Sequence, residues 1–592
     1  MMSFLEICSL FEKLENTSSR NDMVDILVEA TRGMTSYELQ VFSYLVQGRL
    51  APMFVSAEFN LSEKGLLNAL SREYGDEVFD LRKKEGDLGI VAEKLSLKTQ
   101  KGLLLDFVYD ELWRIVNTKG SGSVEFKYSA FIALIRQSSF LEARYLTRII
   151  LGKLRLGCSV KTLLDAFSVR ISGDKSVRDL LDLAYGASAD IGYISQIVAG
   201  DNPLEGLKRV TPLPGVPVLS RLVERVKTFE EVGERFKSEF AVQPKYDGLR
   251  CQIHKISSKS HTLDERVWHG RLKSAEIDMF GVVKEDVKLF TRNLEDITEM
   301  FPEIVESVRK LPVDSAILDS EIVGWDGSKF LSYQDTMTRR RKYGVEEQKS
   351  GVPVNAFVFD LMQLNGGSYL QSTTKDRFEM LGTVVKEGLD IQLSPCDFIS
   401  SVSELKDLFN KYVDLGLEGV IVKDSLSTYI PGVRNFEWIK IKKSIDSDLV
   451  DTVDLVVLGY YLGSGKRSKF GIGAILGGVY NPEFERYESV TKIGTGITDE
   501  QWGGIKERLD GVGVDSVPKN VVIEKVLDPD VYVSPEVVIT VDADEVSVNR
   551  SSEGVAKGLS LRFPRLVEFD RDKNPEDSTT VDELYALLPS RE

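Results

Sequence analysis

The spacing of apolar residues changes twice along this chain of 592 residues, and these changes limit the folds that are open to it. Up to about residue 205 the apolar residues recur with a helical spacing, as at Leu141, Tyr145 and Ile149. The Pro- and Gly-rich passage Val210–Pro217 then ends that pattern. Short strands mixed with helices follow, and from about Ser444 strands dominate. The sequence therefore predicts three domains in series.

We expect the domain boundaries at residues 1–210, 211–443 and 444–592. The first domain is predicted to be all-α, the second α+β and the third all-β. Several short strands in the third domain suit a small barrel, for which an OB-fold is the natural candidate. The strands expected in the second domain are Cys251–Lys255, Ala316–Val323, Ala356–Leu361 and Gly419–Val422. Those expected in the third domain are Leu455–Tyr461, Ala474–Tyr480, Ser489–Ile493, Val521–Val526 and Val537–Val541.

Composition narrows the class of protein. The chain is 42% hydrophobic and 28% charged, as soluble globular proteins are. It lacks an apolar run of about 18 residues and a secretory signal pattern, so we expect a cytoplasmic protein without a membrane span. Four dispersed cysteines and three histidines argue against a structural zinc site or a disulfide framework. The net charge of −17 taken alone speaks against nucleic acid, but basic clusters occur locally.

The sharpest local motif is Gln243–Arg250, with the sequence QPKYDGLR. It places Lys245 directly before a Tyr-Asp-Gly turn, with Arg250 after the turn. A lysine amine is a poor nucleophile at its ordinary pKa of about 10.4 and is activated when desolvation or neighbouring cations lower that value. A surface hairpin with a solvated lysine is the alternative interpretation of the motif seen alone.

Further motifs follow in order down to the C-terminus. Glu321 stands in an apolar strand, where an unpaired charge is costly. Lys440 and Lys442 share one face of a strand. Each has an ordinary structural alternative: Phe359 as a core aromatic, and Glu321 or Glu418 as a salt-bridged carboxylate. The motifs are Thr291–Asp296 with Arg292, Ile317–Ile322 with Glu321, Val358–Leu361 with Phe359, Leu417–Lys423 with Glu418, Tyr429–Arg434, Trp438–Lys442 and Ser560–Arg565.

These motifs, in this order, resemble the nucleotidyltransferase motifs of ATP-dependent DNA ligases, members of the covalent nucleotidyltransferase superfamily. The similarity is greatest to the larger archaeal and eukaryotic replicative type. Upstream, Ala143–Gly157 resembles the helical DNA-binding domain of that family, and Lys573–Thr580 resembles its C-terminal tail. The resemblance implies a helical DNA-binding domain, an α+β adenylation domain and an OB-fold domain. It also implies nick sealing in duplex DNA through a lysyl-AMP intermediate, in replication, repair and recombination.

The resemblance assigns roles to individual residues. Lys245 would be the nucleophile, Phe359 would stack on adenine, and Glu418 with Glu321 would hold Mg²⁺. The residues that would bind ATP are Gln243, Arg250, Arg292, Glu321, Phe359, Arg434, Lys440 and Lys442. The residues that would contact DNA are Arg144, Arg148, Lys153, Arg339, Arg340 and Arg565.

Two stretches depart from the family pattern or add to it. Gln243 stands where the family usually has Glu, which leaves the choice among ATP, ADP and GTP open. Residues 256–287 form a stretch where relatives often have a short hairpin turn, so it is either a surface loop or a change to DNA contact. Gln100–Phe107 faintly resembles a peptide that binds a sliding clamp, although a core helix explains it equally. We expect a nucleoid-associated monomer.

Three other functions remain as alternatives. An RNA ligase or mRNA capping enzyme would share the motifs but generally lacks the long helical N-terminal region. An NAD⁺-dependent ligase would carry a zinc-binding cysteine cluster, which this chain lacks. A catalytically silent nick-binding protein would not need Lys245 together with Glu418 and the lysines of the Trp438–Lys442 motif.

Overall fold

The computed structural model describes residues 2–17, 19–96, 102–154, 156–226, 228–257, 268, 271, 286–327, 329–331, 336, 352–385, 388–442, 452–463, 465–548 and 555–588. They form two compact units, Met1–Lys442 and Lys443–Glu592. The first unit contains a helical region followed by an α+β region, and the second is rich in strands.

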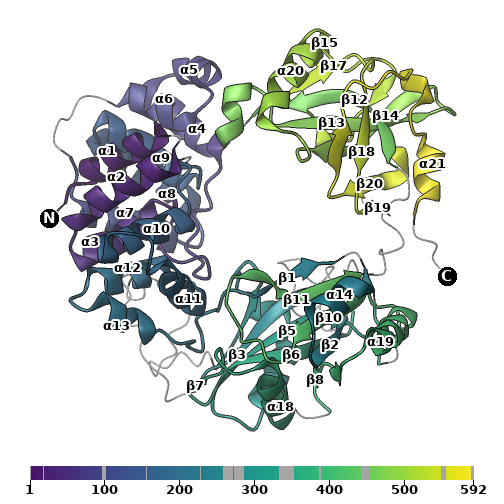
Figure 1. The fold of residues 1–592 in the computed structure, drawn as a ribbon. Coiled ribbons are helices and arrows are strands. Elements are labelled where there is room, and N and C mark those ends of the chain that lie inside the picture. The colour runs from purple at the N-terminus through teal and green to yellow at the C-terminus, as the bar shows by residue number, and fades with distance from the viewer. Residues whose placement is uncertain are drawn as a thin grey trace. The chain divides into compact units, whose positions relative to one another are not determined.

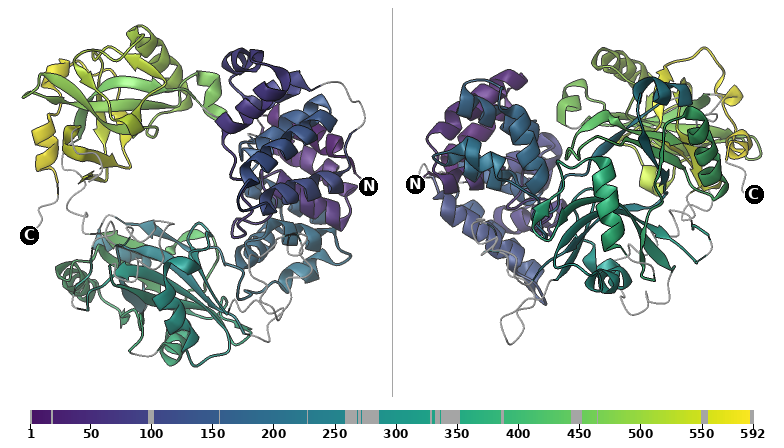
Figure 2. Two further views of the ribbon diagram at one scale, coloured as in Figure 1. Left: turned by 180° about the vertical axis from the view of Figure 1, so that it is seen from behind. Right: turned by 60° about the horizontal axis from the view of Figure 1, so that its bottom comes forward.

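The helical region consists of helices that pack side by side (Figure 1, and from behind in Figure 2). Helix α9 packs against α1 and α6, and α12 packs against α3. Among the described residues, no helix combines the length and apolar character that a membrane crossing demands. The helices are α1 (Phe4–Glu15), α2 (Arg20–Arg32), α3 (Ser36–Leu45), α4 (Glu63–Tyr74), α5 (Glu77–Glu85), α6 (Leu88–Leu95), α7 (Leu105–Asn117), α8 (Ser123–Gln137), α9 (Phe140–Ile150), α10 (Val160–Ser172), α11 (Arg178–Ser188), α12 (Ile191–Ala199) and α13 (Pro203–Lys208).

Local sequence explains where several of these helices begin. Ser3, Thr35 and Ser139 each start a helix with a capping box, in which a glutamate three residues later bonds back to the cap. The apolar stripe of α7 is buried, because residues three or four apart lie on one face. The buried side chains of the region join in one continuous hydrophobic core.

The Pro- and Gly-rich passage after α13 is packed onto the α+β region. The backbone N–H of Val218 donates to Gln252 Oε1 at 3.0 Å, and that of Gly215 donates to His254 Nδ1 at 3.2 Å. Burial lowers the pKa of His254 to about 3, so the imidazole is neutral and can accept this bond. The passage is therefore a docked connection and not a free linker.

Two sheets form the α+β region. The first has the strand order β1-β11-β10-β2-β9, and the second has the order β4-β3-β5-β6-β7 with β8 paired to β6. Helix α18 packs on β6, and α19 packs on β2 and β10 (Figure 1). The elements are β1 (Leu222–Arg225), α14 (Phe229–Arg235), β2 (Phe240–Lys245), β3 (Leu249–Lys255), β4 (Val287–Thr291), α15 (Pro302–Arg309), β5 (Ala316–Gly324), β6 (Val354–Leu364), β7 (Gly367–Ser368), α18 (Thr374–Val384), β8 (Ile391–Leu393), β9 (Asp397–Ile399), α19 (Val402–Asp414), β10 (Gly419–Asp424) and β11 (Arg434–Lys442). All four strands expected here are confirmed, within β3, β5, β6 and β10.

The second unit is built on one large sheet in which β12 pairs with β13, β17 and β18. This unit is rich in strands, as predicted, but it is not all-β, because α20 (Asp499–Asp510) and α21 (Val581–Ala586) pack into its core. The predicted strand Val521–Val526 is also shorter than expected, since a 3₁₀ turn at Lys525–Leu527 follows it closely. The strands are β12 (Val453–Tyr461), β13 (Ala474–Asn481), β14 (Arg486–Ile493), β15 (Gly513–Val514), β16 (Val521–Val522), β17 (Val531–Val533), β18 (Val538–Asp542), β19 (Glu545–Val548), β20 (Leu559–Arg562) and β21 (Arg565–Glu568).

Candidate active site

A cavity of about 220 Å³ is lined by side chains from both sheets of the α+β region. Strand register brings distant motifs together at it. Gly419 of β10 pairs with Lys245 of β2 on one side and with Lys442 of β11 on the other. Two residues along, Ile421 pairs likewise with Gln243 and Lys440. The lining residues are Val223, Gln243, Pro244, Lys245, Tyr246, Arg250, Arg292, Glu321, Phe359, Ile421, Lys423, Trp438 and Lys440.

Lys245 lies at the end of β2, where its ammonium forms an ion pair with Glu418. The backbone N–H of Glu418 also donates to the carbonyl of Lys245, at 3.1 Å. Lys442 Nζ lies 3.7 Å from the same carboxylate. Burial raises the pKa of Glu418, but the charges of Lys245 and Lys442 outweigh it and hold that pKa below its ordinary value. Glu418 is thus an ionised carboxylate beside the lysine.

Arg250 is held by the buried carboxylate of Asp319, which lies in the Ile317–Ile322 motif but was not among the predicted site residues. Its Nε and Nη2 donate to the two oxygens of Asp319, at 3.1 and 2.6 Å. Tyr429 Oη donates to Asp319 at 2.9 Å as well. Burial lowers the pKa of Arg250, but Asp319 more than offsets it and raises that pKa. Asp319 lies two residues before Glu321 on the same strand, so both side chains lie on one face of the sheet. That spacing is the sequence signal from which Asp319 could have been predicted as a site residue.

Phe359 is the extra residue at an irregularity in the pairing of β5 with β6. Its half-buried ring has the guanidinium of Arg250 at 5.6 Å and the ammonium of Lys423 at 5.1 Å from the ring centre. Its carbonyl accepts hydrogen bonds from Gln243 Nε2 at 3.2 Å and from Lys423 Nζ at 3.3 Å. The ring is therefore positioned by its backbone as well as by its neighbours.

Lys423 and Trp438 connect this ring to the buried interior. Lys423 is 1% exposed, and its Nζ donates to Asp360 Oδ2 at 3.2 Å. The indole of Trp438 has the ammonium of Lys423 at 3.9 Å and the guanidinium of the fully buried Arg221 at 5.0 Å from its ring. Arg221, which precedes β1, was not among the predicted site residues, because no motif marks it.

Glu321 and the arginines determine the charge of the cavity. Burial raises the pKa of Glu321 to about 7, although Lys245 and Arg250 act in the opposite direction. Burial lowers the pKa of Arg292, and the charges of Arg250 and Arg434 lower it further. Three guanidinium groups thus lie close enough to repel one another, which favours an anionic ligand among them.

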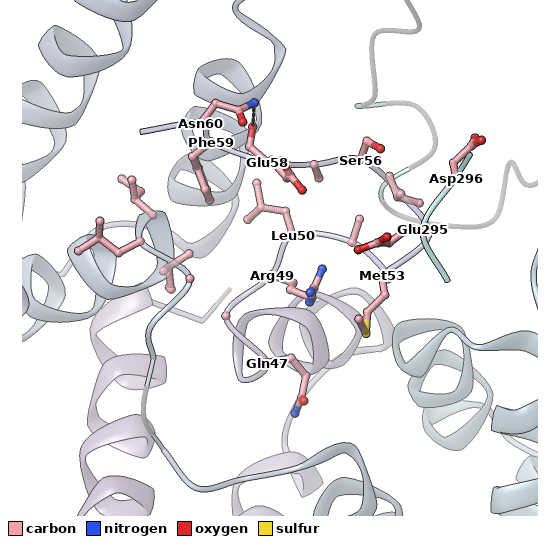
Figure 3. Close-up of a pocket in the computed structure, with 18 of the residues that line it drawn as sticks. Gln47, Arg49, Leu50, Met53, Ser56, Glu58, Phe59, Asn60, Glu295 and Asp296 are labelled. Carbon is pink, nitrogen blue, oxygen red and sulfur yellow. Dashed lines mark hydrogen bonds between the residues drawn. The ribbon is translucent and has the colours of Figure 1, made fainter. Parts of the chain in front are cut away.

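A larger cavity, of about 730 Å³, lies elsewhere in the same unit (Figure 3). Residues 47–61 of the helical region form one side of it, and residues 295–297, after β4, form another. Its described lining includes the acidic side chains of Glu58, Glu295 and Asp296 and none of the predicted ATP-binding residues. The chemistry-bearing side chains therefore gather in the smaller cavity.

The predicted basic face of α9 is not exposed. Arg144 donates to both oxygens of Glu93 at 2.8 Å, and Arg148, whose side chain is 4% exposed, pairs with Glu15 at 2.8 Å and with Asp87 at 3.3 Å. These guanidinium groups join α9 to α1 and α6 and neutralise carboxylates that are buried or half-buried. Contact of Arg144 and Arg148 with DNA stays a prediction, although the ion pairs leave little of either side chain exposed.

The other predicted DNA contacts differ from one another. Lys153 is 54% exposed and pairs with Glu63 at 2.9 Å. Arg565, in the second unit, is 47% exposed and forms an ion pair with Asp544. Arg339 and Arg340 lie outside the described residues.

Comparison with known proteins shows which family this chain is similar to. Family models match three segments: "DNA ligase N terminus" at residues 3–168, "ATP dependent DNA ligase domain" at 279–442 and "ATP dependent DNA ligase C terminal region" at 468–573. A probable DNA ligase of Dictyoglomus turgidum is 37% identical over 600 residues, covering 99% of this chain and 97% of that protein. DNA ligase 1 of Methanosarcina mazei is 36% identical over 604 residues, covering 99% of each.

One solved structure, titled Pmar-Lig_PreS3, covers 95% of this chain and 99% of its own with a TM-score of 0.55 and 16% identity, a likeness of fold. The chain belongs to the ATP-dependent DNA ligase family. It is accordingly an enzyme that uses ATP to seal nicks in DNA through an adenylate intermediate.

Proposed function

We propose that Lys245 is the nucleophile of this ligase. Its Nζ attacks the α-phosphorus of ATP, so that an N–P bond forms and pyrophosphate leaves. AMP then passes to the 5′-phosphate at the nick, and the 3′-hydroxyl displaces AMP as the phosphodiester bond forms. The observation that carries this assignment is the convergence of Lys245 with the side chains of five other motifs on one cavity.

The residues around Lys245 fall into three groups, according to whether their chemistry fits the adenine, the ribose or the phosphates of ATP. Phe359 offers a ring face to adenine, and Gln243, whose Nε2 is engaged, retains a carbonyl oxygen that can accept from an amino group. Glu321 suits the ribose hydroxyls. The cationic side chains suit the phosphates, where they would stabilise charge in the transition state. These cations are Arg250, Arg292, Arg434, Lys440 and Lys442.

Two carboxylates fit a role in holding Mg²⁺. This ion is commonly bound by one or two carboxylates together with substrate phosphates. Among the described residues, no group of three or more His, Cys, Asp or Glu side chains is placed to hold a metal alone. Glu418, ionised beside Lys245, and Glu321, in the cavity wall, could supply the one or two carboxylates that Mg²⁺ needs when phosphates of the substrate also bind it. When bound, the ion would neutralise phosphate charge.

We assign residues 1–210 to DNA binding, 211–443 to adenylation and 444–592 to an OB-fold. The antiparallel order of β12, β13 and β14, with β18 on the other edge of β12, supports the last of these. Lys153, Arg565, Arg339 and Arg340 remain the proposed contacts to nicked duplex DNA. We propose that the enzyme acts as a cytoplasmic, nucleoid-associated monomer in replication, repair and recombination.

The start of α7 supports a sliding clamp as a further partner. Leu104 and Phe107 are 53% and 39% exposed, three residues apart, while Leu105 between them is buried. Two exposed apolar side chains on one face of a helix can act as anchors that insert into an apolar groove of a partner protein. Phe107→Ala should weaken binding to a purified sliding clamp from the source organism about tenfold. Phe140→Ala, at a residue 47% exposed on another helix, is the matched control; equal binding by both variants would contradict the assignment.

The proposed function is tested by following the label of α-labelled ATP. Wild-type protein incubated with Mg²⁺ should acquire a covalent label, and nicked duplex DNA should then discharge it as labelled AMP. A chelator in a parallel arm should prevent labelling. Nicked RNA offered instead should leave the label on the protein. Discharge by RNA alone would favour an RNA ligase, and binding of nicks without any labelling would favour a silent nick-binding protein.

A further inference from the structure

The connection between β3 and β4 is far longer than their pairing requires. The two strands are antiparallel neighbours, and Lys255 pairs with Val287. A hairpin of this kind can be closed by two to five residues, yet residues 256–286 lie between the strands. Two described residues of this stretch, Trp268 and Arg271, contact the helical region within the unit Met1–Lys442. We call these two residues the clasp.

Trp268 extends the core of the helical region. Its side chain is 4% exposed and packs edge-on against Phe54, with ring centres 6.0 Å apart. Phe54 packs in the same manner on Phe290 of β4, at 6.3 Å. The indole Nε1 donates to Asp190 Oδ2 at 3.3 Å, and Asp190 also caps α12. A buried indole whose N–H is bonded is a strong anchor at an interface.

Arg271 adds polar contacts a turn further on. Its Nε donates to Asp110 Oδ1 at 2.8 Å, and its Nη2 donates to Tyr37 Oη at 3.2 Å. The guanidinium also lies 5.1 Å from the ring centre of Tyr109. Its backbone carbonyl accepts from Asn117 Nδ2 at 2.7 Å. The guanidinium group of Arg271 therefore contacts α3 and α7 at the same time. Its planar shape allows it to donate in two directions and to lie near an aromatic ring.

The clasp is one of several attachments between the helical and α+β regions. The first is the docked connection, in which Leu219 N–H donates to the carbonyl of Gly186 at 2.8 Å and Gln252 holds Val218. Another is the packing of Phe54 on Phe290. Each separate attachment further restricts the rotation of one region against the other. Restricting that rotation before DNA arrives removes part of the entropy cost of binding.

We infer that Trp268 and Arg271 are positioning residues for nick sealing, because they hold the helical region in place against the region that carries Lys245. This inference rests on the proposed function of that site. The cavity around Lys245 is lined by residues of the α+β region alone, so adenylation does not need the clasp. Engagement of a nick needs both regions, so the clasp acts on KM for nicked DNA.

The test compares two reactions in the same preparations. Trp268→Ala should raise KM for nicked DNA about tenfold and Arg271→Asp about threefold, with the rate of self-adenylation and kcat at saturating DNA within about twofold of wild type. Asp110→Arg combined with Arg271→Asp should restore most of the lost affinity, because the ion pair is rebuilt in reverse. Arg309→Ala is the control, since it breaks an ion pair between α15 of the α+β region and Asp286 at the end of the same stretch.

Each outcome bears on one claim. An unchanged or lowered KM in Trp268→Ala would overturn the role of the clasp while leaving the adenylation chemistry intact. Loss of self-adenylation in the clasp variants would likewise overturn it, since the effect would then be a general loss of folding. Failure of the wild-type protein to become labelled would instead contradict the proposed function.

Discussion

Lys245→Ala is expected to abolish both the labelled protein–adenylate adduct and nick sealing with ATP, a fall of about 10⁴-fold or more. The physical reason is that, among the described residues, no other lysine of the cavity lining lies as Lys245 does, at the end of β2 beside Glu418. Of the lysines that line the cavity, Lys423 is tied to Asp360 inside the protein, and Lys440 lies across β10 from Gln243. The measurement is retention of label from α-labelled ATP after denaturation.

Lys245→Arg is the matched control for this prediction. It keeps a positive charge beside Glu418, so the ion pair can persist, but a guanidinium does not attack phosphorus at neutral pH. Both variants should still join a nick that already carries 5′-AMP, because that step does not use the amine. Label retained by Lys245→Ala would refute the assignment of the nucleophile.

Asp360→Ala is expected to cost about 3–5 kcal/mol in the free energy of unfolding, because it leaves two buried cations without their carboxylate. Asp360 is 2% exposed and accepts from Arg377 Nε at 2.7 Å and from Lys423 Nζ at 3.2 Å. Burial raises the pKa of Asp360, but Arg377 and Lys423 outweigh it and hold that pKa far below its ordinary value. Urea unfolding followed by circular dichroism measures the loss.

The control is an ion pair of similar length at the surface of the same region. Glu230 lies 2.9 Å from Lys406, with both side chains well exposed. Glu230→Ala should therefore leave the free energy of unfolding almost unchanged. Equal stability of the two variants would contradict the view that Asp360 compensates the buried charges of Arg377 and Lys423.

The motif residues could be predicted because their chemistry is local. A lysine before a tight turn, a carboxylate in an apolar strand and two lysines on one strand face are all visible within a few residues. The order of these motifs was enough to indicate a ligase. What no short window contains is the partner of each group: Asp319, which pairs with Arg250, or Arg221 and Lys423, which both lie close to the ring of Trp438.

Charge patterns have the same limit. Arg144 and Arg148 are spaced as a solvated helical face would be, and only the approach of α1 and α6 shows that carboxylates cover them. Trp268 is the opposite case. It stands in a stretch without a recognisable pattern, and its burial depends on Phe54 and Asp190, more than 70 residues earlier in the chain.

Helical spacing, strand alternation and motif chemistry are properties of neighbouring residues, so the chain alone was sufficient for the class of enzyme and for most elements that carry the site. Pairing of buried charges and contact between regions are decided by groups far apart in sequence. The energies of these interactions depend on which groups are buried together away from water, and only the folded structure determines which groups those are. The tertiary structure therefore decided which cations line the cavity, which merely hold helices together, and how the helical region is attached.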